Sequence, residues 1–211
     1  MLNVIFDLDG TLWDSSETIL DAWKYVFNRY NIIDISQEDI KALLGLPDED
    51  IIKWISEKYL ISSESAKCIL QKCQDYELEL IAVQGGKLYS GVRRTIQELS
   101  KMSNLYIVSN CQAGYIEAFL KYYNLQPFIK DFECAGNTKL NKSVNISKII
   151  NRNHIKNAIF IGDTESDRIA SKENDLEFVY ASYGFGRVKE YDYIINNFKD
   201  IKQLCYNVKK E

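Results

Sequence analysis

Two aspartates follow a short apolar run at the start of the chain, which begins MLNVIFDLDGTLWD. Asp7 and Asp9 are two residues apart, so an extended backbone turns both side chains to the same face. Gly10 and Thr11 come next, and a turn started by the glycine brings backbone amides close to a bound anion. One carboxylate could attack a substrate while the other moves a proton, provided that their environments differ. The pattern therefore predicts nucleophilic and acid–base chemistry at this point of the chain.

Asp163 and Asp167 supply two further acids, after another apolar run. If all four acids meet, two unit charges about 4 Å apart repel by about 4 kcal/mol at an effective dielectric of about 20. Raised pKa values or a bound cation would relieve this repulsion. Mg²⁺ suits a site made of a few carboxylates, waters and a phosphate, so we expect Mg²⁺ as the cofactor. The alternative, that each acid only caps a helix, remains open.

The acids follow apolar runs that read as buried strands of a parallel sheet, because helical patterns separate them. The predicted strands cover residues 2–6, 105–108 and 158–161, and the predicted helices cover 113–123, 143–151 and 165–172. Parallel strands end at one edge of the sheet, where open α/β folds bind ligands. Ser109 and Asn110, which follow the second run, therefore join the four acids at that edge.

Residues 14–86 interrupt this rhythm, because apolar positions recur there every three or four residues. The first expected helix has Ser15 or Ser16 as its cap and buries one face, made of Ile19, Trp23, Val26, Phe27 and Tyr30. A second helix is expected to begin at Ser36, and a third has Pro47 in its first turn. The fourth covers residues 63–83 and stops at Gly85 and Gly86. We interpret the segment as a helical domain inserted into a core of residues 1–13 and 87–211. The two linkers permit a hinged lid.

The predicted insertion is more acidic than the rest of the chain. It holds 14 acids and 7 bases, a balance of −7, whereas the remainder has a balance of +3. Either its solvated helices simply carry many acids, or the insertion is not built to grip a heavily phosphorylated substrate. The net charge of −4 without a polybasic block argues against nucleic acid or an anionic membrane as partner. We expect a small substrate.

The cysteines and the apolar runs bear on the compartment. Five cysteines in no metal-finger spacing predict reduced thiols rather than disulfides or a zinc site. No apolar run approaches the roughly 18 to 20 residues that cross a bilayer, and no basic residue precedes Asp7 as in a secretory signal. A cytoplasmic location is therefore expected, while the sequence leaves the oligomeric state open.

The motifs resemble those of the haloacid dehalogenase-like hydrolase superfamily. Asp7-Leu8-Asp9-Gly10-Thr11 resembles its first motif, Val108-Ser109-Asn110 its second, and Gly162-Asp163-Thr164-x-x-Asp167 its fourth. The insertion is similar to the C1 helical cap of subgroup I, and residues 44–47 and 183–186 resemble loops of phosphoglycolate-phosphatase-like members. The resemblance implies an α/β fold with a Rossmann-like three-layer core around a parallel sheet and an inserted α-helical cap domain.

The resemblance also implies roles for the matching acids. Asp7 would be the nucleophile and a Mg²⁺ ligand. Asp9 would be the general acid and base, and its backbone carbonyl would also bind the metal. Asp163 would complete the metal site, and Asp167 would support it, directly or through water.

Substrate-binding roles follow in the same way for Thr11, Ser109, Asn110 and a lysine. Ser109 and the amide of Asn110 would hold phosphoryl oxygens. Where the family often shows Lys-Pro, this sequence has Lys139-Leu-Asn-Lys142-Ser. We choose Lys142 as the catalytic and phosphate-binding lysine because it opens the next predicted helix, with Lys139 as the alternative.

The implied activity is that of a Mg²⁺-dependent phosphatase acting on a small phosphorylated metabolite through an aspartyl-phosphate. Phosphoglycolate, nucleotides and sugar phosphates are all open as substrates. A sugar phosphomutase of the β-phosphoglucomutase type is an alternative, which Thr11 and the lack of an arginine over residues 43–58 disfavour. A haloacid dehalogenase needs no second acid, so Asp9 disfavours it. A catalytically silent domain that binds a phosphometabolite is the last alternative.

Overall fold

The computed structural model of the chain describes residues 2–32 and 34–208. At its centre is a six-stranded sheet with the strand order β5-β4-β1-β6-β7-β8, in which each neighbouring pair is parallel. The strands are β1 (Asn3–Phe6), β4 (Asn104–Ser109), β5 (Asp131–Cys134), β6 (Ala158–Gly162), β7 (Glu177–Ala181) and β8 (Tyr193–Ile195). The predicted parallel sheet is confirmed.

The central strand β1 is buried along its whole length. Val4 and Phe6 belong to the core on one face of the sheet, and Ile5 belongs to the core on the other. From β1 the chain continues to β4 and β5 on one side, and it returns to β6, β7 and β8 on the other. The strand order therefore reverses at β1, and this is the position where parallel α/β sheets leave a crevice at their carboxyl edge.

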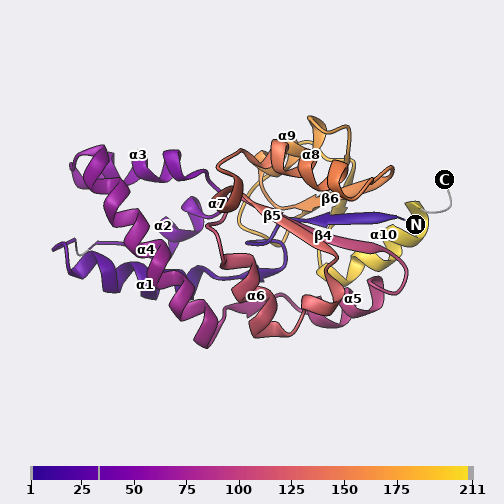
Figure 1. Cartoon of the computed structure of the whole chain (residues 1–211), viewed down its shortest axis with the longest axis horizontal. Helices are drawn as coiled ribbons and strands as arrows, with labels where there is room; N and C mark the ends of the chain where they lie inside the picture. Colours follow the sequence, from indigo (N-terminus) through magenta and orange to yellow (C-terminus); the bar gives the residue numbers. More distant parts are fainter. Residues whose placement is uncertain (1, 33, 209–211) are drawn as a thin grey trace.

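Helices cover both faces of the sheet, as the three-layer prediction requires (Figure 1). On one face lie α8 (Lys142–Arg152) and α9 (Glu165–Lys172), and on the other lie α5 (Val92–Leu99), α6 (Tyr115–Tyr123) and α10 (Ile201–Val208). Shorter helical turns are α7 (Ala135–Thr138), η1 (Gln126–Phe128) and η2 (Phe198–Asp200). Within the described residues, no helix combines the length and the apolar character that a membrane span requires.

The inserted helices form a body at one end of the sheet, on the left in Figure 1. They are α1 (Ser16–Asn28), α2 (Gln37–Leu43), α3 (Asp48–Tyr59) and α4 (Ser63–Gln84), with α4 packed against α1, α3 and the core helix α6. The chain enters this cap through β2 (Trp13–Asp14) and leaves it through β3 (Lys87–Leu88), which pair antiparallel. The helical cap is confirmed, and its boundaries at residues 14 and 86 stay a prediction.

Helix starts and ends depart from the sequence expectations at a few positions. Tyr30, expected on the buried face of the first helix, lies beyond the end of α1 and is 39% exposed, because the chain has already turned there. Pro47 precedes α3 instead of lying in its first turn. Neither expected serine caps α1 with its side chain. Asp14 accepts hydrogen bonds from the backbone N–H and the hydroxyl of Ser16, while Ser15 turns its hydroxyl toward the carboxyl edge of the sheet.

Candidate active site

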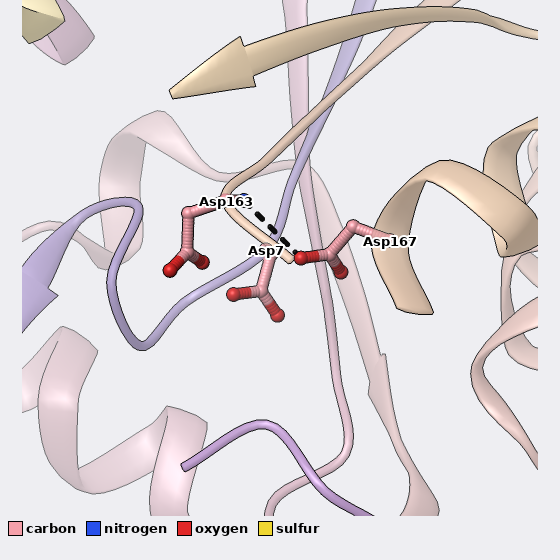
Figure 2. Close-up of side chains that lie close together, drawn as sticks. All are labelled: Asp7, Asp163 and Asp167. Atoms are coloured by element: carbon pink, nitrogen blue, oxygen red, sulfur yellow. Dashed lines mark hydrogen bonds between the residues drawn. The ribbon is translucent and has the colours of Figure 1, made fainter. Parts of the chain in front are cut away.

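Three acids from the segments after β1 and β6 meet at the carboxyl edge of the sheet (Figure 2). Asp7 directly follows β1, Asp163 directly follows β6, and Asp167 lies in the first turn of α9. One carboxylate oxygen from each lies within 4.8 Å of the others, and all three side chains are buried. Because β1 and β6 are paired in register as neighbours, the first two acids emerge side by side.

The start of α9 fixes the orientation of Asp167. Its Oδ2 accepts hydrogen bonds from the hydroxyl of Thr164 at 2.6 Å and from the backbone N–H groups of Thr164 and Asp163 at 3.0 and 3.2 Å. The hydroxyl of Thr164 in turn accepts from the backbone N–H of Asp167, which completes a capping box. A Cβ atom at Gly162 would lie 2.5 Å from this carboxyl group, so only glycine fits there. The other oxygen, Oδ1, accepts a hydrogen bond from the ammonium group of Lys142.

One lysine reaches this cluster. Lys142, the first residue of α8, is buried, and its Nζ donates hydrogen bonds to Asp7 Oδ1 at 2.7 Å and to Asp167 Oδ1 at 2.5 Å. Burial lowers the pKa of Lys142, but the charges and hydrogen bonds of the two carboxylates outweigh burial and hold its pKa above the usual value. Lys139, the alternative, is exposed after α7 with a φ of 59°. Lys142 is thus the cation beside Asp7.

Three carboxylates and one ammonium group leave an excess of negative charge in a buried site. Burial raises the pKa of Asp7 well above its ordinary value, and repulsion from the other two acids adds to this, while Lys142 opposes it. Burial and the charge of Asp167 likewise raise the pKa of Asp163 to about 7. The raised pKa values express the cost of collecting these acids without a further cation. A set of buried carboxylate oxygens with this excess of negative charge fits a hard divalent cation such as Mg²⁺.

The glycine-rich turn after β7 orients Asp163. The Oδ2 atom of Asp163 accepts hydrogen bonds from the backbone N–H groups of Phe185 at 2.7 Å and Gly186 at 3.2 Å. Thr11, expected to bind substrate, is fully buried and points its hydroxyl to Asp163 Oδ1 at 3.4 Å. Gly10 has a φ of +82°, and a Cβ atom there would lie 2.2 Å from Asp163 Oδ2. The first motif and this turn therefore both serve to position Asp163.

Asp9 has surroundings of a different kind. Its Oδ1 accepts hydrogen bonds from the hydroxyl of Ser15 at 2.5 Å and from the phenol of Tyr115 at 2.9 Å, both neutral groups. Burial raises the pKa of Asp9, and these hydrogen bonds oppose the increase. Sequence reasoning missed both partners, because Ser15 reads as a helix cap and Tyr115 reads as a core position of a helix.

The segment after β4 completes the edge and touches the cap. Ser109 is buried, and its hydroxyl accepts a hydrogen bond from the backbone N–H of Cys111 at 3.2 Å. The side-chain amide of Asn110 donates to the backbone carbonyl of Gly45 at 2.8 Å. Gly45 has a φ of +84° and lies in the cap loop over residues 44–47. The loop that the sequence singled out therefore reaches the active-site edge.

A cavity of about 60 Å³ lies between this edge and the cap. Asp7, Asp9 and Ser109 line it from the core, and mostly apolar side chains of α1 to α4 line it from the cap. The cap also contributes a buried glutamate, Glu77 of α4, which the sequence did not distinguish from a surface acid. The structure therefore places Asp7, Asp9 and the second motif on the wall of one cavity, with Lys142, Asp163 and Asp167 gathered around Asp7.

Comparison with known proteins gives relatives named as a phosphatase and a pyrophosphatase. The chain is 22% identical over 192 residues to a phosphoglycolate phosphatase of Vibrio parahaemolyticus, covering 86% of this chain and 84% of that protein. It is 29% identical over 126 residues to the pyrophosphatase PpaX of Bacillus mycoides, covering 59% of this chain and 55% of that protein. A crystal structure described as a predicted phosphatase from Clostridium acetobutylicum matches with a TM-score of 0.78 at 26% identity, covering 99% and 98% of the two chains.

The family comparison covers the site as well as the fold. The family described as haloacid dehalogenase-like hydrolase matches residues 4–181, from β1 to the end of β7. This span includes both strands that carry the acids, the whole cap, and the lysine at the start of α8. The chain is therefore an enzyme of the haloacid dehalogenase-like hydrolase family.

Proposed function

We propose that this hydrolase is a Mg²⁺-dependent phosphatase that cleaves a small phosphate monoester through a covalent phosphate on Asp7. The observation that carries the proposal is that Asp7 and Asp9 line one cavity but have different partners. Asp7 pairs with the ammonium group of Lys142, which favours an ionised nucleophile, whereas Asp9 is held by neutral hydroxyl groups and can exchange a proton. The phosphatase and pyrophosphatase names of the relatives support the same reaction class.

In the first step, a carboxylate oxygen of Asp7 attacks phosphorus. The bond from phosphorus to the ester oxygen breaks, and the leaving oxygen takes the electron pair and then a proton from Asp9. The ammonium group of Lys142, 2.7 Å from Asp7, offsets the charge on the phosphoryl group, and Ser109 with the backbone amide of Asn110 binds its oxygens. The products of this step are the free alcohol and a phosphorylated Asp7.

In the second step, water attacks the phosphorylated aspartate. Asp9, now ionised, removes a proton from the water, the bond from phosphorus to the Asp7 oxygen breaks, and inorganic phosphate leaves. Ser15 and Tyr115 hold Oδ1 of Asp9 and so fix the orientation of the carboxyl group in both steps. Asp9 finishes the cycle protonated, as it began.

Asp7, Asp163 and the backbone carbonyl of Asp9 would hold Mg²⁺, with Asp167 binding directly or through water. The ion would supply positive charge next to the phosphoryl oxygens. Thr11 acts on this site by positioning Asp163 rather than by touching substrate. We also propose residues 14–86 as the cap that closes over the reacting groups.

Hydrolysis of p-nitrophenyl phosphate with Mg²⁺ tests the proposal. We expect turnover that chelation abolishes, and a loss on the order of a thousandfold or more in Asp7→Asn, because an amide cannot serve as the nucleophile. Circular dichroism of the variant would show whether it keeps its fold. Release of phosphate from a sugar phosphate without any isomerised product would separate phosphatase from phosphomutase. Absence of activity across a broad panel of phosphate esters would contradict the enzyme proposal.

A further inference from the structure

A buried carboxylate of the cap lines the active-site cavity without a charged partner. Glu77 of α4 is 5% exposed. One of its oxygens accepts a hydrogen bond from the indole N–H of Trp23 in α1, and the other accepts from the side-chain amide of Gln112 at 2.8 Å. Both donors are neutral, and within the part of the chain that the structure describes no lysine or arginine forms an ion pair with Glu77.

The charged groups on the cavity wall all have the same sign. They are Asp7, Asp9, Asp48 and Glu77, and the described residues that line the cavity include no lysine or arginine. The ammonium group of Lys142 lies behind Asp7, where the carboxylates of Asp7 and Asp167 already use it. The remaining wall is mostly apolar. A second anionic group on a substrate would therefore lose its hydration beside Glu77 without gaining a counter-charge.

We propose, on the basis of the phosphatase function above, that Glu77 selects the leaving group, and that the preferred substrate is a short phosphomonoester whose alkyl chain ends in an amine. The phosphoryl group would lie at Asp7, the apolar cap side chains would surround the alkyl chain, and the ammonium group would pair with Glu77. The small cavity, about 60 Å³, favours a short chain. Carboxylate or second phosphate groups on the leaving group are selected against.

The electrostatic state of Glu77 agrees with this assignment. Burial raises its pKa to about 7, and the charges of Asp9 and Asp48 add to the increase, while the two hydrogen bonds oppose it. A bound ammonium group would supply the missing positive charge and keep the carboxylate ionised. Phosphoglycolate and pyrophosphate, the compounds in the names of the two relatives, each carry a second anionic group. We therefore expect both to be poor substrates of this chain.

Three probes of matched size test the proposal with the Mg²⁺-loaded wild-type enzyme. They are O-phosphoethanolamine, 2-hydroxyethyl phosphate and 2-phosphoglycolate, each with two carbons after the ester oxygen; the second carbon carries an amine, carries a hydroxyl group, or is itself the carboxylate carbon. We expect kcat/KM to fall in that order, by about tenfold or more between the amine and the carboxylate. If the enzyme hydrolyses p-nitrophenyl phosphate but its kcat/KM for phosphoglycolate equals or exceeds that for O-phosphoethanolamine, the proposed specificity is wrong and the phosphatase function stands. Turnover of none of the four compounds would overturn the phosphatase function itself.

A pair of variants isolates the charge of Glu77. Glu77→Gln keeps the shape and a hydrogen-bonding side chain but removes the charge, so the amine-to-carboxylate ratio of kcat/KM should fall about tenfold or more. Glu79→Gln, an exposed acid on the same helix, should leave the ratio unchanged. An unchanged ratio in Glu77→Gln would overturn the proposal. If Glu77→Gln fails to fold, the ranking of the three probes by the wild-type enzyme still decides it.

Discussion

At the scale of single residues, two carboxyl groups of the same type lie two positions apart in different surroundings. Asp7 has a charged partner in Lys142, and Asp9 has the neutral hydroxyl groups of Ser15 and Tyr115. Lys142 opposes the rise of the Asp7 pKa with a full charge as well as a hydrogen bond, whereas Ser15 and Tyr115 oppose the rise of the Asp9 pKa with hydrogen bonds alone. In the proposed mechanism, this difference in surroundings allows one acid to attack and the other to transfer protons.

The lysine at the start of α8 provides a direct test of this arrangement. Lys142→Ala removes the cation that pairs with Asp7 and Asp167, and we expect kcat with p-nitrophenyl phosphate to fall about a hundredfold or more. Lys139→Ala removes an exposed lysine nearby and serves as the matched control. If Lys139→Ala abolished turnover and Lys142→Ala did not, the assignment of the motif lysine would be wrong.

The buried Glu77 predicts a pH dependence of stability. Its pKa is raised from 4.5 to about 7 in the folded chain, so between these pH values the folded state keeps a proton that the unfolded state has lost. This group therefore lowers the free energy of unfolding as pH rises through that window, on the order of 3 kcal/mol in total. Glu77→Gln removes this pH dependence, while Asp9 and Asp48, which face the side chain, remain. In urea unfolding, the free energy of unfolding of Glu77→Gln minus that of wild type should therefore rise between pH 5 and pH 8.

A matched variant shows whether that trend belongs to Glu77. Glu79→Gln removes an exposed acid from the same helix, and its stability difference from wild type should be the same at both pH values. An equal difference at pH 5 and pH 8 for Glu77→Gln would mean that the carboxyl group is not held protonated in the folded chain.

Sequence reasoning located the site residues that follow strands or lie in the first turn of a core helix, and it missed Ser15, Tyr115 and Glu77. The acid pair at Asp7 and Asp9 can be recognised in the sequence, because two charged residues directly after a buried apolar run are unusual. Tyr115 and Glu77 carry no such signal, since each occupies an ordinary position in a helical pattern. Their importance arises only when α6 and α4 pack around the crevice, and single-sequence spacing does not encode that packing.

At the scale of elements, the N-terminus of α9 couples helix stability to the site. Thr164→Val removes the hydroxyl that caps the helix and also donates to Asp167 at 2.6 Å. We expect the free energy of unfolding to fall by about 1 to 2 kcal/mol in urea denaturation, and kcat to fall as Asp167 loses its orientation. Ser62→Ala removes an N-cap from α4 and should lower stability without changing kcat. Equal kcat in Thr164→Val and wild type would contradict the coupling.

The elements that sequence reasoning missed are those whose stabilising partners come from elsewhere in the chain. The strand β5 carries the acids Asp131 and Glu133, so it lacks the apolar run by which other strands were predicted. In the fold it lies at the edge of the sheet, and the guanidinium group of Arg152 in α8 pairs with both acids at 2.8 and 3.0 Å. The strand β8 has only three residues, Tyr193–Ile195, too few for a period to be recognised. Buried runs such as β1 and β6 were predictable because their pattern depends on burial alone.

At the scale of the whole molecule, the cap is closed over the core. Asn110 and Gln112 of the core hydrogen-bond to Gly45 and Glu77 of the cap, and a small cavity lies between the two parts. The connections at β2 and β3 lie side by side, and Trp13 of β2 is anchored by edge-on contacts with aromatic rings of α6. We expect this anchored pair of strands to keep the two parts connected when the cap moves to admit substrate.

Metal binding should stabilise the whole fold, because the proposed ligands converge only in the folded chain. Without metal, the raised pKa of Asp163 lowers the free energy of unfolding as pH rises from 3.8 to about 7, and at pH 8 the folded chain bears the full cost of the ionised group. Asp163→Asn should therefore have a higher melting temperature than wild type at pH 8 in chelator.

With Mg²⁺ at about a hundredfold its Kd, the free energy of unfolding of wild type should rise by about 2.7 kcal/mol, whereas that of Asp163→Asn should rise little. Thermal denaturation of both proteins, with the exposed Asp175→Asn as control, measures this. An equal Mg²⁺-dependent rise in melting temperature for Asp163→Asn and wild type would exclude Asp163 as a ligand.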